Sequence, residues 1–188
     1  MKRYLLILVT VVISTPLFAQ DFSVNVNTLP VINGAINVGA AYAINNKYTI
    51  DLSGAVRPWT RNENSVNRYW GVKPETRYWF CQKFNGSFLG VFMTGSQYNI
   101  GGVDMPFGMF SDVEKYRFEG WALGGGVSYG YHFVLSKHWN IEASIGAGYT
   151  YYDFTQYRCP LLCARVLKDD CYHYWGINTA SLSLVYIF

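Results

Sequence analysis

Hydrophobic and polar residues alternate with a period of two along most of the chain after residue 20. Such alternation is typical of β-strands, because successive side chains of a strand point to opposite faces of its sheet. Hardly any segment has the period of an α-helix. The pattern predicts about eight strands, near residues 22–29, 35–44, 48–59, 69–80, 88–100, 118–135, 139–157 and 174–188.

The connections between the predicted strands alternate in length. Short turns fall at 45–47, 81–86 and 136–138, and the first connection, near 30–34, is also short. Longer connections cover 60–68, 101–117 and 158–173. Short periplasmic turns and longer external loops are typical of outer-membrane β-barrels. The order of short and long connections fits eight strands with both chain termini in the periplasm.

The charged residues of the predicted strands lie on the face opposite the aliphatic row. In segment 48–59, for example, Ile50 and Leu52 share one face while Asp51 and Arg57 share the other. In a membrane barrel the apolar face meets lipid and the charged face lines the lumen. The faces of 88–100 are mixed and stay unassigned. The residues predicted to point into the lumen include Asp51, Arg57, Lys73, Glu75, Arg77 and Glu142.

The final strand carries Leu182, Leu184, Tyr186 and Phe188 on one face, a pattern that resembles the C-terminal strand signal of outer-membrane barrels. We therefore expect an all-β fold, a single closed antiparallel transmembrane β-barrel of about eight strands. This size is OmpA/OmpX-like.

The barrel domain is expected to cover residues 20–188. Lys2 and Arg3, a short apolar stretch and Leu17-Phe18-Ala19 predict an N-terminal signal peptide over residues 1–19.

Composition supports a barrel in a membrane. Aromatic residues make up 18% of the chain and charged residues only 14%, as aromatic girdles at two membrane interfaces would produce. Without Lys2 and Arg3, 13 basic residues remain against 12 acidic ones. A nearly neutral chain argues against a nucleic-acid partner, which requires a basic surface. Outer-membrane lipid is the expected partner of the apolar face.

The charges predicted inside the barrel allow two interpretations. They could form a catalytic carboxylate pair or a proton path, or they could pair with one another and plug the lumen. We favour the plug, because an eight-stranded barrel is just wide enough for side chains to fill, and buried charges need partners. The small inward row from Gly120 to Gly130 leaves room for Arg77 and Trp79. At Pro74, which cannot donate to a ladder, we expect a local bulge.

Two motifs suggest chemistry only weakly. Ser128 and His132 share the inward row and could form a minimal hydrolase pair. A hydrogen-bonded interior histidine is the favoured interpretation, because such a pair would point into the plug. Gly124-Gly125-Gly126 lacks the lysine and helix of a phosphate loop. We therefore expect no enzyme, no cofactor, and no catalytic, cofactor-binding or metal residues.

The cysteines are harder to interpret. Cys159, Cys163 and Cys171 fall in the last predicted loop, followed by His173. This spacing could bind zinc. A disulfide is favoured in an exported protein and would leave one of the three cysteines unpaired. Cys81 lies at a predicted periplasmic turn, across an apolar band of ~25 Å, so it cannot reach the others and its role stays open.

The predicted loop 101–117 contains an apolar run from Val103 to Phe110. Exposed Met, Phe and Pro residues often mark a contact with another protein. The same run could instead fold over the mouth of the barrel and bury itself. Both alternatives stay open.

The chain resembles an uncharacterised family of short outer-membrane barrel proteins of Gram-negative bacteria, often described near fimbrial genes. The resemblance covers nearly the whole chain after the signal peptide, and the family has proline and cysteine at the positions of Pro74 and Cys81. It implies no established activity. Its main motifs are Thr49-Ile50-Asp51-Leu52-Ser53-Gly54, Pro74-Glu75-Thr76-Arg77-Tyr78-Trp79-Phe80-Cys81, Phe84-Asn85-Gly86, Gln97-Tyr98-Asn99-Ile100-Gly101-Gly102, Ser128-Tyr129-Gly130-Tyr131, Trp139-Asn140-Ile141-Glu142 and Tyr186-Ile187-Phe188.

Together these features predict an outer-membrane barrel with a charge-plugged lumen, acting as a binding or accessory protein of the cell envelope. The family resemblance suggests a link to surface fibres, with loop 101–117 contacting another envelope or fibre protein. The alternative is a stand-alone structural or adhesion barrel. A lipid-modifying enzyme or a narrow pore is less favoured.

Overall fold

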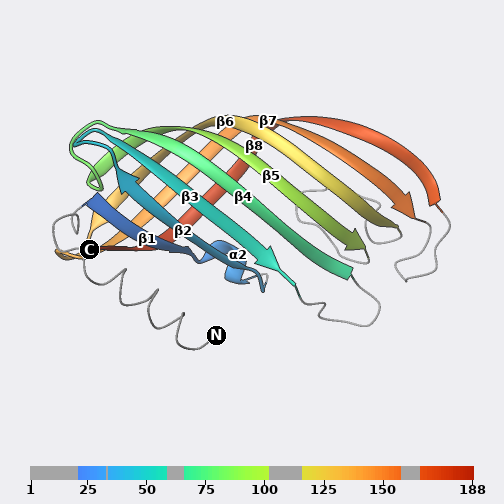
Figure 1. Ribbon diagram of the computed structural model, residues 1–188, viewed down its shortest axis with the longest axis horizontal. Coiled ribbons are helices and arrows are strands. Elements are labelled where there is room, and N and C mark those ends of the chain that lie inside the picture. The colour runs from blue at the N-terminus through green and yellow to red at the C-terminus, as the bar shows by residue number, and fades with distance from the viewer. Residues whose placement is uncertain (1–20, 33, 59–65, 102–115, 158–165) are drawn as a thin grey trace, which may run out of the picture.

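Eight strands follow one another around a closed barrel in chain order, each antiparallel to its neighbours (Figure 1). The computed structural model describes residues 21–32, 34–58, 66–101, 116–157 and 166–188. The strands are β1 (Phe22–Asn27), β2 (Ile36–Ala43), β3 (Tyr48–Arg57), β4 (Val66–Trp79), β5 (Gly86–Gly101), β6 (Arg117–Val134), β7 (Trp139–Tyr157) and β8 (Val166–Ile187). Pairing between β1 and β8 closes the barrel.

The connections divide between two ends of the barrel. The turn end holds 44–47, 80–85 and 135–138; at the other end, which we call the loop end, β3, β5 and β7 finish and β4, β6 and β8 begin. A four-residue helix, α2 (Leu29–Ile32), joins β1 to β2 where a turn was predicted. Among the described residues, the structure contains no helix with the length and apolar character needed to cross a membrane. The predicted signal peptide, 1–19, lies outside them.

The all-β, eight-stranded closed barrel predicted from the sequence is confirmed. The predicted start of its last strand was wrong. β8 begins at Val166 rather than near residue 174. Lys168, Asp169 and Asp170 interrupt the alternation of apolar residues, so no strand pattern is visible there. The ladder with β7 holds this segment in the sheet, from Tyr157 opposite Val166 to Tyr151 opposite His173.

The prediction of a bulge at Pro74 was also wrong. Pairing between β4 and β5 stops after Val72 opposite Gly95 and resumes at Glu75 opposite Phe92 in the same register. The strand therefore passes Pro74 without an extra residue, and only ladder pairing is lost there. Two irregularities lie on β8 instead. Ala147 faces Ile177 while Gly146 faces Thr179, so Asn178 is an extra residue there. Tyr157 faces Val166 while Gln156 faces Lys168, so Leu167 is another.

The outer wall is apolar and exposed. Leu52 on β3 and Val91 and Met93 on β5 are 58%, 63% and 68% exposed on the outside of the barrel. Aromatic side chains ring the wall at two levels, near the turn end and toward the loop end. The first ring includes Tyr42, Tyr48, Tyr78, Tyr131 and Trp139, and the second includes Trp70, Trp121 and Trp175.

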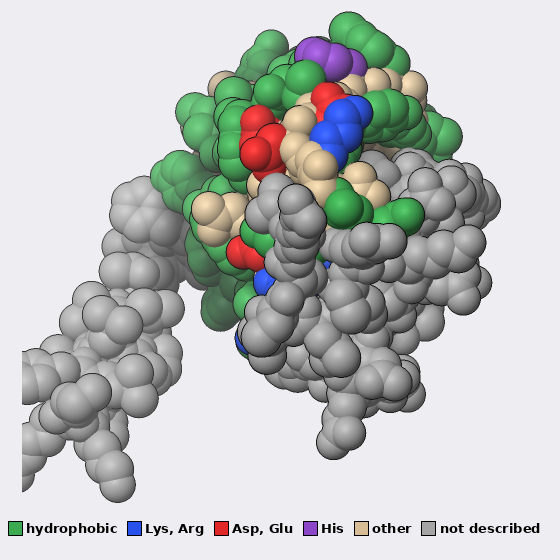
Figure 2. All heavy atoms as spheres, turned by 90° about the vertical axis from the view of Figure 1, so that its right-hand side faces the viewer, with side chains coloured by type: hydrophobic (Ala, Val, Ile, Leu, Met, Phe, Trp, Pro, Cys, Tyr) green, Lys and Arg blue, Asp and Glu red, His purple; other side chains and the backbone are tan. Residues whose placement is uncertain are grey.

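The surface therefore changes character between the wall and the loop end. Figure 2 looks at the loop end and shows hydrophobic side chains on the outer flank, with acidic, basic and histidine side chains gathered at the end itself.

The lumen is filled near the turn end. Trp79 and Phe88 are fully buried there, and Phe84 folds in from the β4–β5 turn. Phe84 has a φ of 59°, an uncommon left-handed conformation for a residue other than glycine. Gly130 on β6 lies directly against the Phe88 ring, so a Cβ at that position would collide with it. The mixed segment 88–100 is now assigned, with Phe88 inside and Leu89 outside.

Candidate functional site

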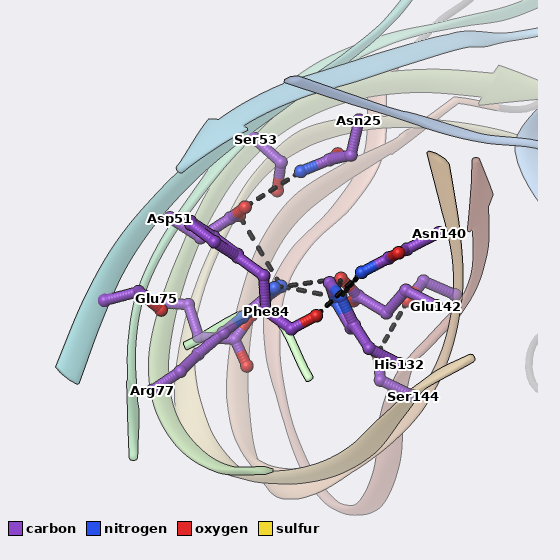
Figure 3. Close-up of polar contacts among 12 residues, drawn as sticks. Asn25, Asp51, Ser53, Glu75, Arg77, Phe84, His132, Asn140, Glu142 and Ser144 are labelled. Atoms are coloured by element: carbon purple, nitrogen blue, oxygen red, sulfur yellow. Dashed lines mark hydrogen bonds and ion pairs between the residues drawn. The ribbon is translucent and has the colours of Figure 1, made fainter. Parts of the chain in front are cut away.

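Strand alternation turns five ionisable side chains into the lumen at one level of the barrel (Figure 3). Each is at most 4% exposed. They lie at one level because the ladders place Asp51 opposite Glu75 and His132 opposite Glu142. We call this group the charged cluster: Asp51 on β3, Glu75 and Arg77 on β4, His132 on β6 and Glu142 on β7.

Arg77 lies at the centre of the charged cluster. Its Nη1 donates to Glu142 Oε2 at 2.9 Å, and its Nε and Nη2 donate to Glu75 Oε2 at 3.1 and 2.9 Å. Nη2 also lies 3.7 Å from Asp51 Oδ1. On the turn-end side, the guanidinium carbon lies 4.6 Å from the centre of the Phe88 ring. One planar guanidinium thus joins carboxylates from three strands, as its fixed set of five donors allows.

His132 connects the charged cluster to the β4–β5 turn. Asn140 Nδ2 donates to the Phe84 carbonyl oxygen at 2.7 Å and to His132 Nδ1 at 3.3 Å. A carbonyl oxygen only accepts, so the Asn140 amide nitrogen must point this way and His132 Nδ1 must accept. The histidine therefore donates from Nε2 to Glu142 Oε2 at 2.8 Å. Trp79 packs edge-on against the imidazole, with ring centres 4.8 Å apart.

Glu75 has two further partners. The Ser128 hydroxyl donates to Glu75 Oε1, and Lys73 Nζ lies 3.1 Å from Glu75 Oε2. Gly90 on β5 leaves the space that Ser128 and Glu75 occupy. The Lys73 side chain is 18% exposed, whereas that of Glu75 is fully buried. Lys73 therefore borders the cluster on its more open side.

Arg57, which was predicted to line the lumen with these residues, lies apart from the charged cluster. Arg57 faces Tyr69 on β4, whereas Arg77 faces Thr49, eight positions nearer the turn end of β3. That separation is about 26 Å along the strand, since each residue advances ~3.3 Å. With His132 neutral, three carboxylates face two cations, Arg77 and Lys73, and the local formal charge is −1.

The structure does not bring Ser128 and His132 together. Ser128 binds Glu75, and His132 binds Glu142 and Asn140. Both side chains are at most 3% exposed. The predicted interior histidine with satisfied hydrogen bonds is what the structure contains. Gly124-Gly125-Gly126 lies within strand β6 rather than in a loop.

The predicted cysteine cluster is only partly described. Cys159 and Cys163 lie outside the described residues. Cys171 and His173 lie on β8 rather than in a loop, and Cys171 is an exposed free thiol. Cys81 is an exposed free thiol at the turn end.

Within the described part of the chain, no group of three or more His, Cys, Asp or Glu residues could hold a metal ion. The whole apolar run 103–110, within residues 102–115, also lies outside the described residues.

Sequence reasoning missed three contributors to the site. Phe84 was assigned only to a short turn, yet its ring and its carbonyl group both enter the barrel. Asn25 on β1 donates from Nδ2 to Asp51 Oδ2 at 2.9 Å. Phe92 closes the lumen beside Lys73, whose ammonium lies 5.8 Å from the ring centre. The one sequence signal for Asn25 is its position between Val24 and Val26, since alternation places its amide on the face opposite those valines.

A closed barrel with an apolar, aromatic-ringed exterior and a charged interior is the inverse of a soluble sandwich. The outer wall can lie in hydrocarbon, and every strand finds its ladder partners within the barrel. These properties define an outer-membrane β-barrel protein, located in the outer membrane.

Residues 4–188 match the model of a family described as "Protein of unknown function (DUF3575)", and the chain belongs to this family. The predicted resemblance to an uncharacterised family is thereby confirmed. No curated protein matches the chain. Among solved structures, the chain is similar to the NMR solution structure of outer membrane protein W of E. coli, at 12% identity and a TM-score of 0.41. That similarity covers 90% of this chain and 98% of the other.

Arg77→Met should lower the free energy of unfolding by about 3–5 kcal/mol, because it leaves three buried carboxylates without their shared cation. Urea unfolding of the protein in lipid vesicles, followed by tryptophan fluorescence, measures the change. Lys137→Met, in the exposed β6–β7 turn, is the matched control and should stay within about 0.5 kcal/mol of wild type. Equal effects of the two substitutions would contradict the central role of Arg77.

Proposed function

We propose that this protein is a non-conducting barrel that serves as a binding or accessory protein of the cell envelope. The observation that carries the proposal is the closed section of the lumen. Arg77 and its carboxylates span it, and Trp79, Phe84 and Phe88 pack on the turn-end side. A solute crossing the barrel would have to break buried ion pairs and displace packed rings. Such a barrel acts at its external surface rather than by passing solutes through.

The partner we propose is another envelope or surface-fibre protein, bound through loop 101–117. Supporting this are the apolar sequence of 103–110 and the concentration of charged side chains at the loop end (Figure 2). A contact of this kind combines an apolar centre with a polar rim. A stand-alone structural or adhesion barrel is the competing function, and partner capture separates the two.

Purified wild-type protein should give no stepwise current in planar lipid bilayers, because the charged cluster and the packed rings close the lumen. The same bilayers, after addition of a known general porin, supply the positive control. Regular conductance steps from the purified barrel would make it a pore and would overturn the proposal of a plugged lumen.

Replacing 103–110 with a glycine-serine segment of equal length should remove a stoichiometric partner that co-purifies with the tagged wild-type barrel from native outer membranes in mild detergent. The partner is lost because the apolar contact is lost while the length of the loop is kept. An equal-length replacement of 59–65 is the control and should keep the partner. A barrel that purifies alone in all three cases would favour the stand-alone function.

A further inference from the structure

The lumen is hollow between the charged cluster and the loop end. A cavity of about 360 Å³ lies there, with Asp51, Lys73, Arg77 and Glu142 at its floor. The turn-end half holds tryptophan and phenylalanine side chains, but here the inward residues are small. Ser53, Gly71, Ser96 and Ala122 line the space from four successive strands. Since side chains can fill an eight-stranded barrel, this run of small residues is what keeps the space open. We call it the upper chamber.

Neutral hydrogen-bonding groups line the upper chamber. Asparagine, serine and threonine side chains come from β1, β2, β3, β5, β7 and β8, and they include Asn27, Asn37, Ser96, Thr150, Asn178 and Ser181. These groups both donate and accept, and none of them carries a charge. Large aliphatic side chains, which would bind an acyl chain, are nearly absent from the lining. The walls therefore suit a ligand rich in hydroxyl groups.

Two buried oxygens at the upper chamber lack a hydrogen-bond donor among the described residues. Asp51 Oδ1 is one, since its nearest cation, Arg77 Nη2, lies 3.7 Å away. Asn178 Oδ1 is the other, although the same amide donates from Nδ2 to Thr150 Oγ1 at 3.2 Å. Unsatisfied buried acceptors are rare in native structures, and these two belong to wall side chains whose hydrogen bonding within the protein is incomplete.

Aromatic rings border the upper chamber on its loop-end side. Tyr69 and Tyr152 are part of the lining, and the Tyr98 ring lies 6.2 Å from that of Tyr152. A tyrosine offers an apolar ring face together with a polar hydroxyl group. The C–H face of a sugar ring fits such a surface while the sugar hydroxyls reach the walls. The floor adds little net charge, because Arg77 and Lys73 offset most of the carboxylate charge.

From these features we infer that the upper chamber is a binding site for a small neutral saccharide. Its volume is at the lower end of the ~300–1,000 Å³ typical of small-molecule sites, which suits one or two sugar rings. This role goes beyond the proposed protein contact at loop 101–117 and needs no passage through the barrel.

Ligand-observed saturation-transfer NMR tests the inference on the whole folded protein in detergent micelles. The probes are glucose, galactose, mannose and N-acetylglucosamine, each at millimolar concentration. At least one should receive saturation from wild type. Ser96→Phe, which fills the upper chamber, should reduce that transfer at least tenfold. Met93→Phe is the matched control on the lipid-facing side of the same strand and should leave the transfer unchanged.

Ala55→Leu fills the upper chamber from β3 instead of β5. It is a second filling variant, so that a folding defect of Ser96→Phe alone does not decide the result. Migration on unboiled gels shows whether each variant is folded. Absence of transfer to all four sugars from wild type would overturn the inference. Transfer that persists in both folded filling variants would place sugar binding elsewhere and overturn it equally.

Discussion

The structure depends on one guanidinium group buried inside a barrel that lies in lipid. Arg77 contacts carboxylates of β3, β4 and β7, and all four side chains are almost fully buried. Each of these charges alone would be strongly unfavourable, and together they are stable only in this geometry. The ion pairs therefore fix the relative positions of strands that are distant in sequence. They also close the lumen.

Everything else follows from how the space around Arg77 is filled. Toward the turn end, the rings of Trp79, Phe84 and Phe88 form one buried cluster. Toward the loop end, small polar residues leave the upper chamber. The same barrel thus has a sealed half and an open half. The outer wall is apolar along both halves, because both are in contact with lipid.

Much of this was accessible from the sequence, because a period of two reports which face a residue occupies. It identified the strands and placed Asp51, Glu75, Arg77 and Glu142 inside. It could not report height along the barrel, so Arg57 was wrongly grouped with them. Nor could alternation find contributions from turns, which is why Phe84 was missed.

The remaining wrong predictions concern features that depend on pairing between strands. The start of β8 depends on its ladder with β7 rather than on its own charged residues. The extra residues occur at Asn178 and Leu167 on β8 rather than at Pro74, because only the register between strands determines where an extra residue is needed. These are properties of the closed barrel, and no local pattern of residues reports them.

Cysteine accessibility along the inward row of β5 tests the central claim most directly. In a cysteine-free background, single cysteines replace Ser96, Thr94, Phe92 or Phe88, and a charged thiol reagent is added to the protein in micelles. The account predicts that positions 96 and 94, which line the upper chamber, react quickly. Positions 92 and 88 should react at least tenfold more slowly, because they lie in the sealed half. Similar rates at all four positions would show an open lumen and contradict the account.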